Sequence, residues 1–311
     1  MDLKSGKTPL RRPRFILECA SQAYPGRHYF ARWRRFRFLI RTVLCYKTTI
    51  SWLDACLTSR LPGLTCQAPQ CFERTHRPFL HNAFRPNEIV RVSLEHQRYA
   101  YELLPSIACE IAKSGRAVIA RFRLGDESWQ IVLEVLEQFK REGDWTLSIK
   151  NSDGSSVVSC SFSIAALGGR ILRPRILIGN VQGPGKGQDG LCLFRSLTRK
   201  WHGWRPKWLA VRLIQVIAVE INARSVLMVT NDTHVYASWR YPSFKHRIAA
   251  DYKALAIECG ATQQWRGCLL LAKARAGGKG RCDDLALSRR DRRTKLLTHL
   301  TQQIQCSIRS T

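Results

Sequence analysis

The residues best suited to chemistry lie between Gln182 and Lys207, where a glycine-rich stretch leads into a basic one. Glycines let the backbone approach a ligand closely, and the first amides of a helix point outward at the positive end of its dipole. The pattern favours a bound phosphate or another anion, including the pyrophosphate of an acyl-CoA donor, but it is not a P-loop. The alternative is a surface loop before a cationic helix start. The candidate anion-binding residues are Gln182, Gly183, Lys200, His202, Gly203, Arg205 and Lys207.

A second polar group follows the short apolar run over residues 225–230. His234 is a candidate general base and Tyr236 a candidate acid or positioning group, because polar residues at the carboxyl end of a central strand often line a site in α/β proteins. Asp251 and Tyr252 would cap or support the same region. We favour the plainer alternative, in which His234 is a hydrogen-bonding residue that fixes a turn.

The chain has 12 cysteines, and no two are spaced as Cys-x-x-Cys. Without a recognisable export signal, no disulfide framework is expected. Cys66, Cys71, His76 and His81 recur every five residues, and four such ligands could hold Zn²⁺. Zinc sites usually pair their ligands two to four residues apart, however. The favoured interpretation is a loop with unrelated thiols and imidazoles, and no metal site.

Basic residues outnumber acidic ones by 51 to 23, so the formal net charge is +28. Residues 1–60 carry +10 and 61–170 only +1, whereas 171–265 carry +9 and 266–311 carry +8. Such a distribution attracts RNA or DNA phosphates, anionic lipid headgroups or a phosphorylated cofactor. The run from Arg32 to Phe38 interleaves arginines with aromatic residues, which suits a membrane interface or stacked bases. We favour a basic helix with packed aromatic residues and solvated arginines.

The spacing of apolar residues predicts helices over 27–57 and 86–114, separated by a proline-containing loop over 58–87. Alternation with a period of two then predicts an antiparallel meander over 116–166, with a hairpin turn at Asp153-Gly154. The rest of the chain predicts a strand over 175–182, a helix over 205–223, a strand over 225–230, a helix over 244–259, a strand over 265–273 and a helix over 285–305.

These elements predict an α/β (α+β) fold, in which an antiparallel β-meander is followed by a βαβαβ unit. We expect a basic helical N-terminal extension with a Pro-containing linker over 1–84, and an α/β domain over 85–311. The element order is similar to that of GNAT acyltransferases. Element order alone is an analogy and does not establish an activity.

Several motifs between about residue 175 and 300 form a specific set. They are Ile178-Gly179, Gln182-Gly183-Pro184, the run from Leu197 to Lys207, Val229-Thr230-Asn231, His234-Val235-Tyr236, the stretch from Lys245 to Tyr252, and the arginines of 289–293. On these residues the chain resembles the VirK/YbjX family of Gram-negative bacterial proteins, and most of all its VirK-type members. Weaker similarity extends back to about residue 85. Residues 254–257 and 267–272 depart from the family's usual aromatic pair and Phe-Tyr-x-Leu-Pro-like strand.

The resemblance implies a virulence accessory protein of unknown mechanism. It would support the production and correct surface localisation of an outer-membrane autotransporter used for actin-based intracellular and intercellular spread. YbjX-type members are linked to remodelling of the cell envelope and resistance to antimicrobial peptides. The partners implied are components of envelope or surface-protein biogenesis.

Two alternative functions stay open. One is a GNAT-like acyltransferase that uses acyl-CoA to modify an envelope component or a protein. The other is an RNA-binding post-transcriptional regulator, although no RNA-binding module is recognisable. The basic segments would suit either anionic lipid or RNA.

The sequence predicts no transmembrane segment, because Arg41 and Lys47 interrupt the most apolar N-terminal stretch. The first 15 residues are basic, but the apolar run that follows is short and contains Glu18, which is atypical of a secretory signal. We therefore expect a cytoplasmic protein, with peripheral association at the inner membrane as the alternative.

Overall fold

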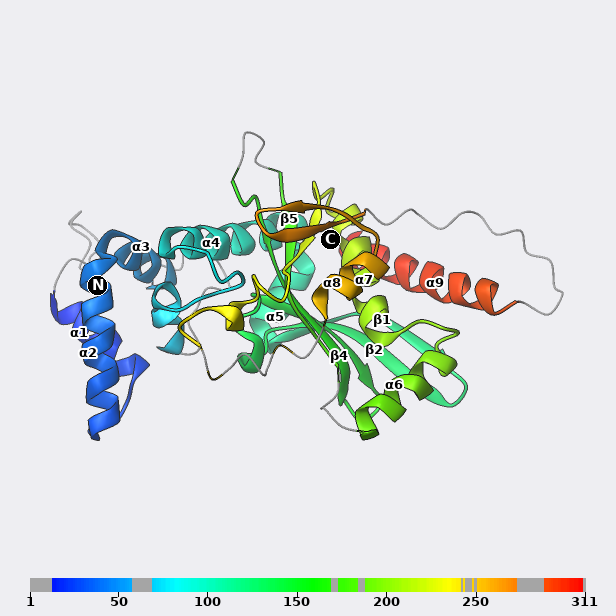
Figure 1. Cartoon of the computed structure of the whole chain (residues 1–311), viewed down its shortest axis with the longest axis horizontal. Helices are drawn as coiled ribbons and strands as arrows, with labels where there is room; N and C mark the ends of the chain where they lie inside the picture. Colours follow the sequence, from blue (N-terminus) through cyan, green and yellow to red (C-terminus); the bar gives the residue numbers. More distant parts are fainter. Residues whose placement is uncertain are drawn as a thin grey trace.

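The computed structural model describes residues 13–57, 69–168, 173–183, 188–241, 243, 248, 251–272 and 288–309. Three N-terminal helices, α1 (Pro13–Ala23), α2 (Tyr29–Leu44) and α3 (Tyr46–Leu57), lie at one end of the long axis (Figure 1). A mixed sheet occupies the middle, and helix α9 (Arg289–Arg309) extends toward the other end. This arrangement confirms the predicted mixed α/β fold with a helical N-terminal region.

The N-terminal helices have a small hydrophobic core of their own. It includes Phe38 and Trp52, together with Phe72 from the 3-10 helix η2 (Pro69–His76) and Val90 from α4 (Pro86–Leu103). The helical character predicted over 27–57 is confirmed, as two helices, α2 and α3, that meet at a break at Cys45. Helix α1 was not predicted.

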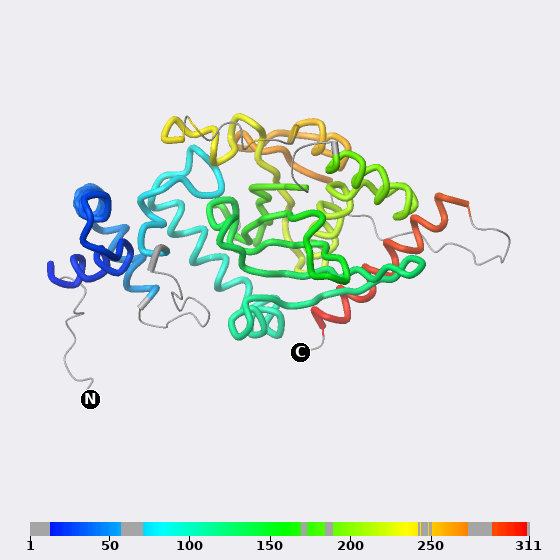
Figure 2. Tube along the Cα trace, turned by 90° about the horizontal axis from the view of Figure 1, so that it is seen from below, coloured from blue at the N-terminus to red at the C-terminus, as the bar shows by residue number. Residues whose placement is uncertain are grey.

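The helix predicted over 86–114 is also two helices. It breaks at Leu104, and Pro105 begins α5 (Pro105–Ser114) at a position where its missing N–H costs no hydrogen bond. Helix α5 ends at Gly115, whose φ of 78° is left-handed. Figure 2 shows α4 running from the N-terminal helices toward the sheet, where it contacts strand β4 (Ser156–Ala165).

The predicted meander is confirmed as four antiparallel strands, with Gly154 in the last turn. Strand β5 (Arg175–Gln182) then pairs antiparallel with β4, and β6 (Val226–Met228) pairs parallel with β5. The sheet order is β1-β2-β3-β4-β5-β6-β8-β7. The remaining strands are β1 (Arg116–Leu124), β2 (Glu127–Glu134), β3 (Trp145–Asn151), β7 (Ala261–Trp265) and β8 (Cys268–Leu271).

Two helices make the crossover from β5 to β6. Helix α7 (Pro206–Glu220) was predicted and packs on β3, β4, β5 and β6, whereas α6 (Gln188–Lys200) was missed. Helix α8 (Tyr252–Glu258) covers the end of the helix predicted over 244–259, most of whose earlier residues lie outside the described part of the chain. The strand predicted over 265–273 corresponds to β8, and β7, which forms an antiparallel hairpin with it, was missed.

The main core lies between the sheet and helices α4, α5, α7 and α9. Gly179 allows the segment around Glu142 to pass close over β5, since a Cβ at position 179 would lie 2.0 Å from the carbonyl oxygen of Glu142. Among the helices described, none combines the length and the apolar character needed to cross a membrane.

Candidate functional site

The predicted anion-binding residues fall into two groups that α6 separates along the chain. Gln182 is exposed at the end of β5. Gly183 packs so closely on Phe194 that a Cβ there would lie 2.2 Å from Cζ of the ring. At the other end of α6, Lys200 forms an ion pair with Glu127. Gly183, in the group before α6, therefore packs against that helix. The second group begins with Lys200, where α6 ends.

His202 and Gly203 form a left-handed turn between α6 and α7, with φ values of 55° and 94°. The turn lies against the start of α9, because a Cβ on Gly203 would be 3.3 Å from Nε of Arg289. Partial burial lowers the pKa of the His202 imidazole, and the charges of Arg292 and Arg289 lower it further. The imidazole is therefore neutral at pH 7 in a cationic setting.

Arg205 and Lys207 flank the first residue of α7. The Arg205 Nη1 atom lies 2.6 Å from Oε1 of Glu258 in α8. Lys207 is partly buried, and this burial lowers its pKa. An anion at the start of α7 would have to compete with Glu258 for the Arg205 guanidinium.

His234, the candidate general base, is only 1% exposed. Its Nδ1 accepts a hydrogen bond of 3.2 Å from the Tyr236 N–H, and its Nε2 lies 3.2 Å from Oε1 of the buried Glu142. The ring packs on that of Tyr252, with 5.3 Å between centroids. This geometry suits the favoured alternative, in which His234 fixes a turn.

Tyr236 lies in the short 3-10 helix η4 (Val235–Ala237), which follows His234 directly. Its side chain is 5% exposed, and its ring packs edge-on against Tyr241, with centroids 5.8 Å apart. Tyr236 thereby contacts the segment over residues 239–241. That segment forms one wall of a cavity.

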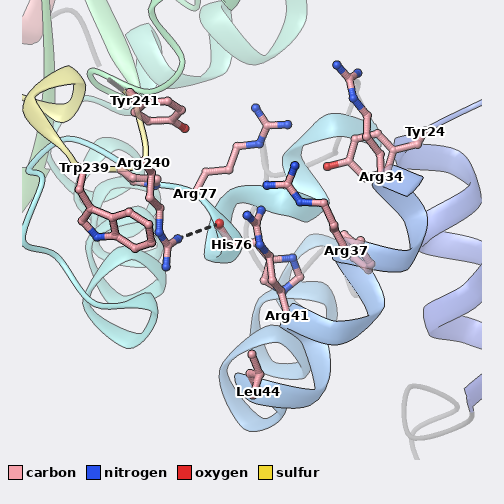
Figure 3. A pocket seen from close by; sticks show the side chains of 12 residues that line it. Tyr24, Arg34, Arg37, Arg41, Leu44, His76, Arg77, Trp239, Arg240 and Tyr241 are labelled. Carbon is pink, nitrogen blue, oxygen red and sulfur yellow. Dashed lines mark hydrogen bonds between the residues drawn. The ribbon is translucent and has the colours of Figure 1, made fainter. Parts of the chain in front are cut away.

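The cavity, of about 630 Å³, lies between α2, η2 and the segment over 239–241 (Figure 3). We call it the arginine pocket, because among the residues that the structure describes, five arginines and no carboxylate line it. In Figure 3 the guanidinium groups of Arg37, Arg41, Arg77 and Arg240 gather around one space, with Trp239 and Tyr241 at one side. The five lining arginines are Arg34, Arg37, Arg41, Arg77 and Arg240.

These arginines lie close enough to repel one another. Burial lowers the pKa of the Arg41 guanidinium, and the charges of Arg37, Arg240 and Arg77 lower it further. Arg77 Nε lies 2.7 Å from Oε2 of Glu73. Within the described part of the chain, the other four arginines of the pocket form no ion pair with a carboxylate. A ligand with several negative charges would therefore relieve their repulsion.

His76 also lines the pocket and is 4% exposed. Its Nε2 lies 3.0 Å from Oγ1 of Thr49, and its carbonyl oxygen accepts a hydrogen bond of 3.3 Å from Arg240. Its Nδ1 is buried with no hydrogen-bond partner among the described residues. Burial lowers the pKa of His76 to about 3, with further lowering by Arg41 and two other arginines of the pocket. The imidazole is therefore neutral.

Of the four residues considered as zinc ligands, the three that the structure describes make different contacts. Cys66 lies outside the described residues, and Cys71 is disulfide-bonded, which corrects the expectation of free thiols. Free thiols were expected because a chain without an export signal stays in a reducing compartment. Which cysteines lie close together in the fold did not enter that expectation. The Nε2 of His81 lies 3.2 Å from the carbonyl oxygen of Arg266. Within the described segments, no three His, Cys, Asp or Glu side chains are arranged to hold a metal ion.

The sequence drew attention to parts of the arginine pocket without joining them. Arg34 and Arg37 belong to the run from Arg32 to Phe38, and Trp239 follows soon after Tyr236. Arg77 and Arg240 were not singled out, and Arg41 was noted only because it interrupts an apolar stretch. These walls come from distant parts of the chain, so no local spacing could place them together; the +10 charge of residues 1–60 was the available signal.

Comparison with known proteins covers most of the chain. A family model described as "Protein of unknown function (DUF535)" matches residues 27–305. The "Uncharacterized protein YbjX" of Escherichia coli (strain K12) is 25% identical over 249 residues, which span 77% of this chain and 72% of that protein. No solved structure matches the chain significantly. The region matched by the family model contains all five arginines of the pocket.

Proposed function

We propose that this chain, which belongs to the DUF535 family, binds a phosphorylated ligand with at least two negative charges in the arginine pocket. The family includes YbjX, and its description gives no activity, so the proposal is argued from the site itself. The observation that carries the proposal is that five arginines line one cavity, and that no carboxylate of the described residues lines it. Membership of the VirK/YbjX family agrees with the motifs of the sequence, and closeness to its VirK-type members stays a prediction.

The ligand class follows from the shape and charge of the pocket. A guanidinium group offers a planar pair of donors that matches a phosphate, and several such groups favour a multiply charged anion. A volume of about 630 Å³ is large for one phosphate and falls within the range of small-molecule sites. Trp239 and Tyr241 add aromatic surface beside the charges. A pyrophosphate or a phosphorylated sugar fits this description.

Calorimetric titration with pyrophosphate at low salt tests the proposal. The double variant Arg37→Gln/Arg240→Gln should weaken binding by more than about tenfold, because each lost charge-assisted hydrogen bond contributes about 1.5–3 kcal/mol. Arg32→Gln is the matched control, since Arg32 lies on the same helix and does not line the pocket. Equal binding by the wild type and the double variant, or an equal loss in the control, would overturn the proposal.

For the biological role, we propose the accessory function that the VirK/YbjX resemblance implies. The protein would support production and surface localisation of an outer-membrane autotransporter, and its partners would be components of envelope or surface-protein biogenesis. The resemblance alone supports this role. In a strain lacking the protein, the wild-type chain should restore surface autotransporter, and Arg37→Gln/Arg240→Gln should fail to do so. Full restoration by that variant would show that the role in autotransporter localisation does not depend on the arginine pocket.

A GNAT-like acyltransferase is a second candidate. The observation that favours it is the strand order, in which an antiparallel meander is followed by β5 and β6, a parallel pair that a helical crossover connects. Its proposed donor site is the region from Gln182 to Lys207, with His234 and Tyr236 as proposed catalytic groups. Acetyl-CoA or a long-chain acyl-CoA should then raise the melting temperature, and Arg205→Ala should abolish the rise. Unchanged melting with both donors would reject this candidate.

A further inference from the structure

Helix α2 exposes an apolar stripe beside the arginine pocket. The side chains of Phe30, Trp33, Phe36, Ile40, Val43 and Leu44 are between 43% and 77% exposed. At about 100° per residue they fall within about 140° of the helix circumference. The opposite side of α2 buries Ala31, Phe38 and Thr42. The stripe is therefore a continuous surface and not a set of scattered apolar residues.

Positive charge borders this stripe. Arg34, Arg37 and Arg41 lie along one edge of it, where they also line the arginine pocket, and Leu44 belongs to both the stripe and the pocket. Helix α2 contains no acidic residue. On the other wall of the pocket, Trp239 is 82% exposed. Apolar and cationic side chains thus meet along one line of the surface.

We infer that α2 lies in the surface of a lipid bilayer that carries anionic headgroups, with the apolar stripe among the upper acyl chains and the arginines at the phosphates. A helix with Trp and Phe on one face and arginines beside them is suited to this boundary, because the apolar face leaves water while the charges reach the headgroups. This surface goes beyond the proposed function and does not require an occupied pocket.

The chemistry of the stripe selects a bilayer over other occupants. Nucleic acid would use the arginines and could stack bases on Trp33 or Phe36, but the aliphatic side chains of Ile40, Val43 and Leu44 give no stacking platform. A second copy of the chain would bring the same arginines against one another across the contact. An anionic bilayer satisfies both the apolar side chains and the charges.

Flotation with lipid vesicles tests the inference. The wild-type protein should bind vesicles containing one quarter phosphatidylglycerol at least about tenfold more strongly than pure phosphatidylcholine vesicles, because anionic lipid attracts the arginines. Trp33→Gln/Phe36→Gln should weaken binding to the anionic vesicles by about tenfold or more. Both residues are exposed, so an unchanged melting temperature should show that the fold is kept.

The matched control makes the same kind of change elsewhere. Leu191→Gln/Ile257→Gln replaces two side chains that are 61% and 59% exposed, on α6 and α8, and should leave vesicle binding unchanged. Equal binding by the α2 variant and the wild type, equal binding to both vesicle types, or complete displacement of the vesicles by RNA would overturn the inference.

A pocket variant separates this inference from the proposed function. Arg240→Gln lies outside α2, so it should weaken pyrophosphate binding and leave vesicle binding within about twofold of the wild type. Trp33→Gln/Phe36→Gln should weaken vesicle binding and leave pyrophosphate binding within about twofold of the wild type. Loss of vesicle binding in Arg240→Gln equal to that in the α2 variant would overturn the independence of the two surfaces.

Discussion

His76 and His96 are buried side chains whose imidazoles stay neutral in the folded protein. Burial lowers their pKa values to about 3 and about 4. His76 faces Arg41, Arg77 and Arg240, whose charges lower its pKa further. The unfolded chain binds protons at these positions near pH 6.5. Protonation of the unfolded state therefore destabilises the fold as the pH falls below about 6.5.

We expect the free energy of unfolding to fall between pH 7 and pH 5, by about 2 kcal/mol for each of these histidines at pH 5. The raised pKa of the buried Glu73 works in the opposite direction and offsets part of this loss. His76→Phe should make the pH dependence shallower, because it removes one of the two groups. Urea unfolding at pH 7, 6 and 5 checks this, and identical pH dependence in the variant and the wild type would contradict it.

Single residues were only partly interpretable from the sequence. His234 and Tyr236 stay candidate catalytic groups, and they lie directly before the pocket wall over 239–241. Arg32, Arg34 and Arg37 of α2 are exposed, as expected, but no local pattern indicated that Arg77 and Arg240 lie across the pocket from α2. Charge repulsion across a pocket becomes visible only when distant segments are brought together.

Among the elements, strands β5 and β6 pair over only a short stretch. They form three register pairs, from Ile176–Val226 to Ile178–Met228. Beyond these pairs, the Tyr252 hydroxyl lies 2.9 Å from Oδ1 of Asn180. The Tyr252 N–H donates to Oδ1 of Asn231 over 3.0 Å. Tyr252, at the start of α8, therefore ties the ends of both strands together.

Tyr252→Phe should lower the free energy of unfolding by about 1–2 kcal/mol, since it leaves the buried Asn180 without this hydrogen bond. Tyr46→Phe is the control, because Tyr46 is 41% exposed and should change stability by less than about 0.5 kcal/mol. Urea unfolding of the three proteins compares them. A loss in the control as large as that in Tyr252→Phe would contradict the role assigned to this hydroxyl.

Periodicity predicted the strands better than the helix boundaries. The meander over β1–β4 alternates strictly enough to be recognised, and Gly154 marks its last turn. Pro105 was an available signal for the break between α4 and α5, since proline at the start of a helix lacks the N–H that a continuous helix requires. Helix α6 follows the glycine-rich stretch closely, and the whole helix was taken for part of the loop before α7.

At the scale of the whole molecule, the arginine pocket joins the N-terminal helices to the α/β part of the chain. Its walls on α2 and η2 belong to the smaller core, and its wall over 239–241 follows β6 of the large sheet. The domain boundary at residue 84 stays a prediction, and Val90 of α4, beyond that boundary, belongs to the smaller core. The net charge predicted an anionic partner in general, but only the assembled chain provides a defined site for one.

The most direct test of the proposed function is the crystal structure of the protein soaked in tungstate, a tetrahedral oxyanion that resembles phosphate and scatters strongly. We expect the highest anomalous peak in the arginine pocket, between the guanidinium groups of Arg37, Arg77 and Arg240. The opposite result, with the highest peak beside Arg205 and Lys207 at the start of α7 and none in the pocket, would contradict the proposed function.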